Sequence, residues 1–141
     1  MRTFKIGMAV FVVFICLILG WIYVNKNSSH VTFQGESQHW KGIYQITGDN
    51  KWTNEELTLT FKGTEVSSDS RVHFSFETTA GGGKVNGAKL GMDRSVKYSS
   101  RGHGTIPVKS EVINVIVEWD GNKEVVQLKN TGLSLIYLTR S

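Results

Sequence analysis

The fold class is decided by residues 111–128, which read EVINVIVEWDGNKEVVQL. Residues 111–119 are almost continuously apolar and rich in β-branched side chains, which is typical of a strand in the middle of a sheet. The pair Asp120-Gly121 then supplies the two residues that a tight hairpin turn prefers, and apolar residues resume after it. This stretch therefore predicts a β-hairpin whose first strand is central in its sheet.

The β pattern continues upstream of this hairpin. Residues 56–61 (ELTLTF) and 71–78 (RVHFSFET) alternate apolar and polar side chains, which is the period of a half-buried strand. Phe33 and residues 40–46 predict two earlier strands, and residues 96–98 predict a weaker one. We expect an all-β, antiparallel β-sandwich of the immunoglobulin-like type with about seven or eight short strands. A small barrel is the alternative, because the Cys…Trp…Cys spacing of true immunoglobulin domains is absent.

The N-terminal segment has a different composition. Residues 6–24 (IGMAVFVVFICLILGWIYV) contain no charged residue and no proline. As a helix rising about 1.5 Å per residue they would span roughly 28 Å, close to the hydrocarbon thickness of a bilayer. Trp21 and Tyr23 lie near the far end, where aromatic rings favour the headgroup layer. The sequence predicts a transmembrane helix within residues 1–24, a polar linker over 25–30 and a β domain over 31–141.

Three alternatives for this segment stay open beside an uncleaved helix. A cleaved signal peptide usually has a shorter apolar run and a small-residue exit, which the residues YVNKNSS do not offer. A lipoprotein signal would use Cys16, but Ile15 stands where a small residue is needed. A buried helix of a soluble protein would have a polar stripe, and this segment has none.

The basic residues predict the orientation of the helix. Arg2, Lys5 and the terminal amine flank one end, whereas only Lys26 is close to the other. The positive-inside bias therefore places the N-terminus in the cytoplasm and the β domain outside a single-pass cell-membrane protein. Cys16 is the only cysteine, so the outer domain has neither disulfides nor cysteine metal sites. Such a domain suits a bacterial envelope.

Three residue types of a hydrolytic triad occur together in residues 33–44 (FQGESQHWKGIY), as Glu36, Ser37 and His39. Triad members are normally brought together by the fold and not by adjacency in the chain. The nucleophile-elbow pattern G-x-S-x-G also fails, because His39 occupies the position of its second glycine. We interpret the stretch as a bend between two strands, in which Gly35 allows the turn and Trp40 fills the core. We predict no catalytic residue here.

Basic side chains are concentrated in residues 84–109, which hold six basic residues and one acid. The chain from Lys26 onward holds fourteen basic and twelve acidic residues. Outside residues 84–109 this leaves eight basic and eleven acidic residues, so the positive charge is segregated. Outside a membrane, a segregated basic surface attracts anionic lipid headgroups or anionic wall polymers. Trp52 lies in a polar segment, where it either stacks on a sugar or partner side chain or caps the core. The predicted binding residues are Trp52, Lys84, Lys89, Arg94, Lys97 and Arg101.

Metal, cofactor and nucleic-acid chemistry are not expected. The four histidines (His30, His39, His73 and His103) have no ligand-like spacing, and the calcium-loop motif is absent. The glycine-rich residues 80–91 lack the phosphate-loop pattern, because Val85 follows Lys84 where Ser or Thr is required. We expect a flexible loop or a bulged sheet edge there, with an adaptable binding loop as the functional alternative. Only Tyr98 offers base stacking in the basic region, so nucleic acid is a poor candidate partner.

Two stretches at the ends of the β domain resemble a known group of proteins. Residues 33–47 (FQGESQHWKGIYQIT) and 115–130 (VIVEWDGNKEVVQLKN) are similar to small, membrane-anchored or lipoprotein-like envelope proteins of Bacillus-type Gram-positive bacteria with one β-sandwich domain. Trp40 and Trp119 match tryptophans of that group. The resemblance implies an envelope location and a β fold, and it implies no catalytic residues. Related proteins often carry a lipobox, from which VFIC around Cys16 departs, and this favours the uncleaved helix.

These observations predict a non-enzymatic, membrane-tethered binding module of the bacterial envelope. One alternative is an envelope hydrolase, which needs at least two of five dispersed side chains within hydrogen-bond reach: Glu36, His39, His73, Glu77 and His103. Another is an accessory subunit of a membrane complex, in which the apolar residues 133–138 (LSLIYL) would add a strand to a partner.

Overall fold

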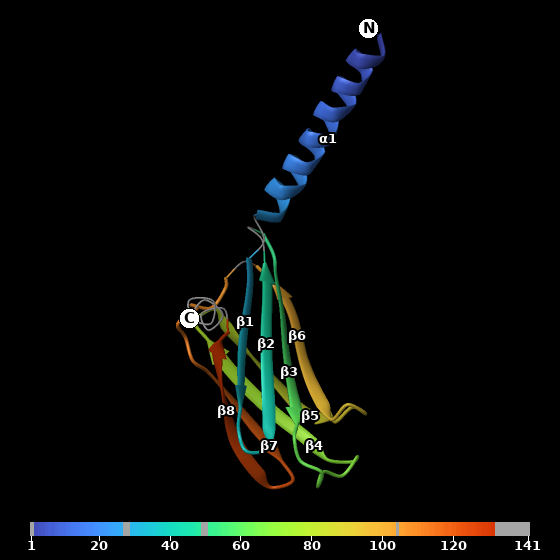
Figure 1. The fold of residues 1–141 in the computed structure, drawn as a ribbon. Coiled ribbons are helices and arrows are strands. Elements are labelled where there is room, and N and C mark those ends of the chain that lie inside the picture. The colour runs from blue at the N-terminus through green and yellow to red at the C-terminus, as the bar shows by residue number, and fades with distance from the viewer. Residues whose placement is uncertain (1, 27–28, 49–50, 104, 132–141) are drawn as a thin grey trace, which may run out of the picture.

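The computed structural model describes residues 2–26, 29–48, 51–103 and 105–131. One N-terminal helix, α1 (Arg2–Lys26), stands apart from a domain of eight strands (Figure 1). All hydrogen-bonded strand pairs are antiparallel, so the predicted all-β class with an N-terminal helix is confirmed. The strands are β1 (Ser29–Glu36), β2 (Trp40–Gly48), β3 (Thr53–Phe61), β4 (Arg71–Thr78), β5 (Gly81–Lys89), β6 (Ser95–Gly102), β7 (Ile113–Trp119) and β8 (Asn122–Asn130).

Helix α1 contains the predicted apolar segment. Residues Lys5–Tyr23 have a mean hydropathy of 2.6, and none of the segment is buried against the rest of the chain. A helix that is apolar on all sides needs apolar surroundings, which the β domain does not provide. This helix is long and apolar enough to cross a membrane.

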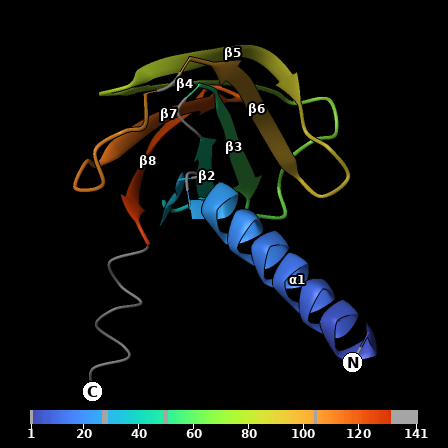
Figure 2. The same cartoon turned by 90° about the horizontal axis from the view of Figure 1, so that it is seen from above.

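The eight strands form one continuous sheet in the order β5-β4-β7-β8-β1-β2-β3-β6. Seen from above, β1, β2, β3 and β6 make one layer, and β5, β4, β7 and β8 make the layer that faces it (Figure 2). The layers join where β1 pairs with β8 through only two residue pairs, Phe33 with Asn130 and Gln34 with Lys129. On the opposite side β5 and β6, both described in full, touch without a hydrogen-bonded ladder. The domain is thus two packed layers rolled into a nearly closed barrel.

The hairpin of β7 and β8 forms as its sequence predicts. Strand β7 lies between β4 and β8, and its alternate residues from Ile113 to Trp119 are buried. Asp120 and Gly121 have positive φ angles of 45° and 78°. A two-residue turn with positive φ at both positions matches the right-handed twist of the strands it joins. The central position of β7 and the turn at 120–121 are therefore confirmed.

The bend at residues 37–39 separates β1 from β2, and Trp40 fills the core beside it. Trp40 is 0% exposed, and its ring packs edge-on against Phe61 and Trp119 at centroid distances of 5.2 and 5.4 Å. Gly35 has a different role from the one expected, since it lies within β1 and not in the turn. A Cβ built there would come within 1.8 Å of the Gln127 carbonyl oxygen on β8. Gly35 therefore allows the two layers to approach where they join.

The glycine-rich segment is a bulged edge strand and not a loop. It forms β5, whose pairing with β4 shifts register between Val72 and Phe74. A Cβ at Gly83 would lie 2.6 Å from the ring of Tyr98 on β6. The absence of a side chain thus lets the two edges of the sheet come together.

The connection between α1 and the β domain is short. The helix extends to Lys26 and β1 begins at Ser29, so two residues connect them where six were expected. At the other terminus, residues 133–138, which the accessory-subunit hypothesis uses, lie outside the described residues.

Candidate binding surface

The six predicted binding residues lie around the two edges of the sheet. Lys84 and Lys89 are on β5, and Lys97 and Arg101 are on β6. Arg94 lies in the connection between these strands. Trp52 immediately precedes β3, which pairs with β6. The fold therefore gathers on one side of the domain residues that are up to 49 positions apart in the chain.

Two of these residues, Lys84 and Lys97, flank the point where the edges meet. Lys84 follows Gly83 and Lys97 precedes Tyr98, and Gly83 and Tyr98 pack against each other. Because side chains alternate along a strand, the side chains of both lysines point outward from the sheet at this point. Both are exposed, and neither forms an ion pair with a described residue. We call this pair of lysines the basic seam.

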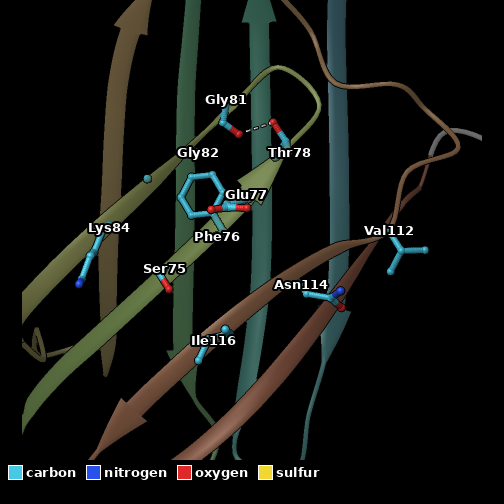
Figure 3. Close-up of a pocket in the computed structure, with 11 residues that line it drawn as sticks. Ser75, Phe76, Glu77, Thr78, Gly81, Gly82, Lys84, Val112, Asn114 and Ile116 are labelled. Atoms are coloured by element: carbon cyan, nitrogen blue, oxygen red, sulfur yellow. Dashed lines mark hydrogen bonds between the residues drawn. The ribbon is translucent and has the colours of Figure 1, made fainter.

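A groove lies on the outer face of β5, β4 and β7, with Lys84 at its β5 side (Figure 3). It is an open hollow of about 1040 Å³. Its floor lacks bulk at Gly81 and Gly82, because those residues have no side chains. The polar side chains in it come from three neighbouring strands: Ser75, Glu77, Thr78, Lys84 and Asn114. Such a groove combines one cation with several hydrogen-bonding groups.

Two other predicted residues have partners in the domain. Lys89 Nζ lies 3.7 Å from Asp69 Oδ1, as an exposed ion pair. Arg94 donates from a guanidinium nitrogen to the Gly63 carbonyl oxygen over 2.5 Å, and its φ of 59° is left-handed. Arg94 thereby ties the β5–β6 turn to the loop after β3, so it has a structural role beside any role in binding.

Trp52 forms a cluster with two residues of the β6 region. Trp52 is 39% exposed. Its ring stacks on His103 at a centroid distance of 4.3 Å, and the Arg101 guanidinium lies 5.1 Å from its centroid. A cation over an indole face is attracted by the ring quadrupole. Trp52 is therefore held in a fixed position with its surface partly accessible.

The five side chains of the hydrolase hypothesis are not brought together. Glu36 pairs with Lys62, His73 accepts from the Gly87 amide, and His103 stacks on Trp52. Glu77 lies on the outer face of β4. Within the described residues, none of the five contacts another of the set, so the arrangement that the hydrolase requires is not formed there.

Sequence reasoning missed the acid that Ser37 and His39 contact. This acid is Glu124 on β8, and not the adjacent Glu36. The Glu124 carboxylate accepts from Ser37 Oγ at 2.5 Å, from the His39 amide at 3.1 Å and from His39 Nδ1. One signal was available, because Glu124 stands in phase with the buried Val126 and Leu128. An acid on the apolar side of a strand indicates a specific polar partner.

The geometry at Glu124 favours a structural role. In a catalytic triad the serine donates to the histidine, and the acid holds the other ring nitrogen. Here Ser37 Oγ and His39 Nδ1 both engage the carboxylate, so the serine proton is not directed to the imidazole. Burial raises the pKa of Glu124, but its hydrogen bonds from Ser37 and His39 outweigh burial and hold the pKa below its usual value. The charged carboxylate fastens the 37–39 turn to β8.

No group of three His, Cys, Asp or Glu side chains that could hold a metal ion occurs in the described part of the chain. Comparison of the chain with protein-family models, curated proteins and solved structures finds no match. Inference about function therefore depends on the surface chemistry described above.

Proposed function

We propose that this protein is a membrane-tethered, extracytoplasmic binding module that holds an anionic polymer of the cell envelope. Helix α1 would be the anchor, with the N-terminus in the cytoplasm. The β domain would present the basic seam and the adjoining groove to the polymer. The module binds and does not catalyse.

The position of Lys84 is the observation that carries this proposal. Lys84 belongs both to the basic seam and to the groove, so a cation lies next to a row of hydrogen-bonding groups. The Glu77 carboxylate and the Asn114 amide can form hydrogen bonds with hydroxyl groups of a ligand. Glu77 would repel an anionic group at its own end of the groove, so the anionic group of the ligand would lie at Lys84. A chain of alternating hydroxyls and anionic groups, such as a polyol phosphate, fits this pattern.

The alternative explanation of the basic residues is a solvated strand surface without a binding role, and the lack of ion pairs at the seam argues against it. Exposed charges on a sheet are commonly offset by opposite charges on neighbouring strands. Lys123 and Glu118 form such a pair at 3.5 Å on β8 and β7. Lys84 and Lys97 instead lie on the two edges without an ion pair to a described residue.

The test uses the full chain in nanodiscs of zwitterionic lipid, so that lipid charge does not compete with the polymer. Binding of poly(glycerol phosphate), polyglutamate and neutral dextran is measured at low and high salt. We expect the phosphate polymer to bind and salt to release it, because exposed charges are screened. Preference for dextran, or binding that salt does not change, would contradict the proposal.

A double variant locates the surface. Lys84→Gln with Lys97→Gln should weaken polymer binding about thirtyfold, since each basic residue at an anionic surface contributes about 1 kcal/mol and 1.4 kcal/mol is tenfold. Lys41→Gln with Lys129→Gln is the matched control, because it removes the same charge from exposed positions on β2 and β8. Equal losses in the two double variants would mean that net charge, and not the seam, determines binding.

A further inference from the structure

One end of the β domain must lie close to the end of α1. The strand register places Ser29 opposite Gly48, Gly48 opposite Thr53, and Thr53 opposite Gly102. These residues form a row across β1, β2, β3 and β6 at the end of the domain where β1 begins. The opposite end holds the turns at 37–39 and 120–121, farthest from α1 in Figure 1.

The covalent connection limits how far this end can stand from a membrane. Three steps of 3.8 Å join the Cα atoms of Lys26 and Ser29, which is at most about 11 Å. The apolar span ends at Tyr23, and three further helical residues add about 4.5 Å. The headgroup layer itself occupies roughly 5–8 Å beyond the hydrocarbon. The start of β1 is therefore at most about 10 Å from the headgroups.

The residues beside this row have the chemistry of a membrane interface. Trp52 precedes Thr53, Arg101 precedes Gly102, and His103 follows it. Together they form the stacked cluster described above, which we call the proximal rim. Tryptophan prefers the headgroup layer, and arginine binds phosphate with a planar set of donors. The rim thus offers an indole and a guanidinium at the end that the tether holds near the lipid.

Charged side chains occur at both ends of the domain. At the far end, the exposed Asp69, Asp93 and Asp120 lie in three separate connections. Near the rim, Glu111 is the acid among the described residues of the β6–β7 connection, and it accepts hydrogen bonds from Thr79. The far end also holds Arg94 and Lys123, and Glu55 and Glu56 line the same hollow as Arg101, so both ends carry charges of both signs. The attraction of the rim for an anionic surface therefore comes from Arg101 itself.

We propose that the proximal rim rests on the membrane and binds anionic phospholipid headgroups, with Trp52 in the headgroup layer and Arg101 against lipid phosphates. This inference rests on the membrane tether of the proposed function, but it does not need the polymer to bind at the basic seam. Contact of the rim with lipid would hold this end of the domain against the bilayer. The groove would then lie at a defined distance from the membrane surface.

The test measures how accessible Trp52 is in the full chain. Nanodiscs are prepared with phosphatidylglycerol or with phosphatidylcholine, and fluorescence is quenched with acrylamide, which is neutral. Subtracting the signal of Trp52→Phe isolates Trp52 from Trp21, Trp40 and Trp119. We expect the quenching constant of Trp52 in phosphatidylglycerol to be about half of that in phosphatidylcholine, because one side of the ring is covered. Equal quenching in the two lipids would overturn the inference.

Two variants identify the cause of any protection. Arg101→Gln should make the quenching of Trp52 equal in phosphatidylglycerol and phosphatidylcholine, whereas Arg71→Gln, an exposed arginine near the far end, should keep the difference between the two lipids. If Arg101→Gln leaves Trp52 protected, the guanidinium does not bind the headgroups and the inference fails. Circular dichroism of each variant verifies that the β domain is intact.

Failure of this inference is distinguishable from failure of the proposed function. A full chain that does not float with liposomes has no membrane tether, and both proposals then fail. A chain that floats and binds polymer, but leaves Trp52 equally quenched in both lipids, overturns the rim contact alone.

Discussion

At the scale of single residues, Glu124 has the clearest energetic consequence. Glu124→Ala leaves Ser37 Oγ and two groups of His39 without their acceptor. Hydrogen bonds to a charged group contribute about 1.5–3 kcal/mol, so we expect a loss of about 2–3 kcal/mol in the free energy of unfolding. Urea denaturation at neutral pH measures it. The control is Glu118→Ala, whose exposed partner Lys123 makes a pair worth less than about 1 kcal/mol.

The Glu124 prediction has a pH dependence of defined sign. The folded-state pKa of Glu124 is lowered, so the unfolded chain binds the proton first as pH falls. The carboxylate therefore stabilises the fold above the unfolded pKa of about 4.3, and this contribution is lost as pH falls through the lower folded value. The difference between wild type and Glu124→Ala should shrink in acid below about pH 4. A difference that grows there would contradict the assignment.

Trp40 yields a second prediction at this scale. Trp40→Ala should cost about 3–5 kcal/mol in unfolding free energy, since a fully buried ring is lost. Trp40 Nε1 is buried and has no hydrogen-bond partner among the described residues. Trp40→Phe keeps an aromatic ring and removes this unpaired donor, whose burial costs about 1–3 kcal/mol. We therefore expect Trp40→Phe to lower the free energy of unfolding much less than Trp40→Ala does. Comparable losses of unfolding free energy in the two variants would show that the donor is paired.

At the scale of elements, the join between β1 and β8 depends on Gly35. A Cβ at Gly35 would overlap the Gln127 carbonyl oxygen, which is backbone and cannot rotate away. Gly35→Ala should therefore lower the unfolding free energy by at least about 2 kcal/mol. Gly102→Ala is the matched control, since a Cβ there meets nothing within 4 Å. Thermal unfolding of both variants checks this, and equal melting temperatures would contradict the role of Gly35.

The elements also show where sequence patterns lose information. Alternation predicts β3 and β4, because apolar and polar residues follow each other in turn along both segments. Pairing between strands far apart in the chain leaves no such local mark. The β1–β8 contact and the approach of β5 to β6 depend on Gly35 and Gly83, whose missing side chains give no periodic signal.

At the scale of the whole molecule, the orientation of the chain is open to direct measurement. Ser68 is exposed in the connection between β3 and β4, at the end far from α1. Ser68→Cys should react with a membrane-impermeant maleimide in intact cells from which the wall has been removed, because the β domain is expected outside. The wild-type chain, with Cys16 alone inside the apolar segment, is the control. Labelling only after permeabilisation would reverse the proposed orientation.

The apolar helix, the all-β class and the turn at Asp120-Gly121 follow from the amino-acid sequence alone, since each depends on local composition, periodicity or turn chemistry. Local charge predicts five of the six binding residues, and the polar surroundings of Trp52 predict the sixth. Three contacts emerge in the folded chain alone: Gly83 packs against Tyr98, Trp52 joins Arg101 and His103, and Ser37 and His39 hydrogen-bond to Glu124. Such contacts depend on which strand edges and turns the nearly closed sheet brings together, and no local pattern of residues encodes this.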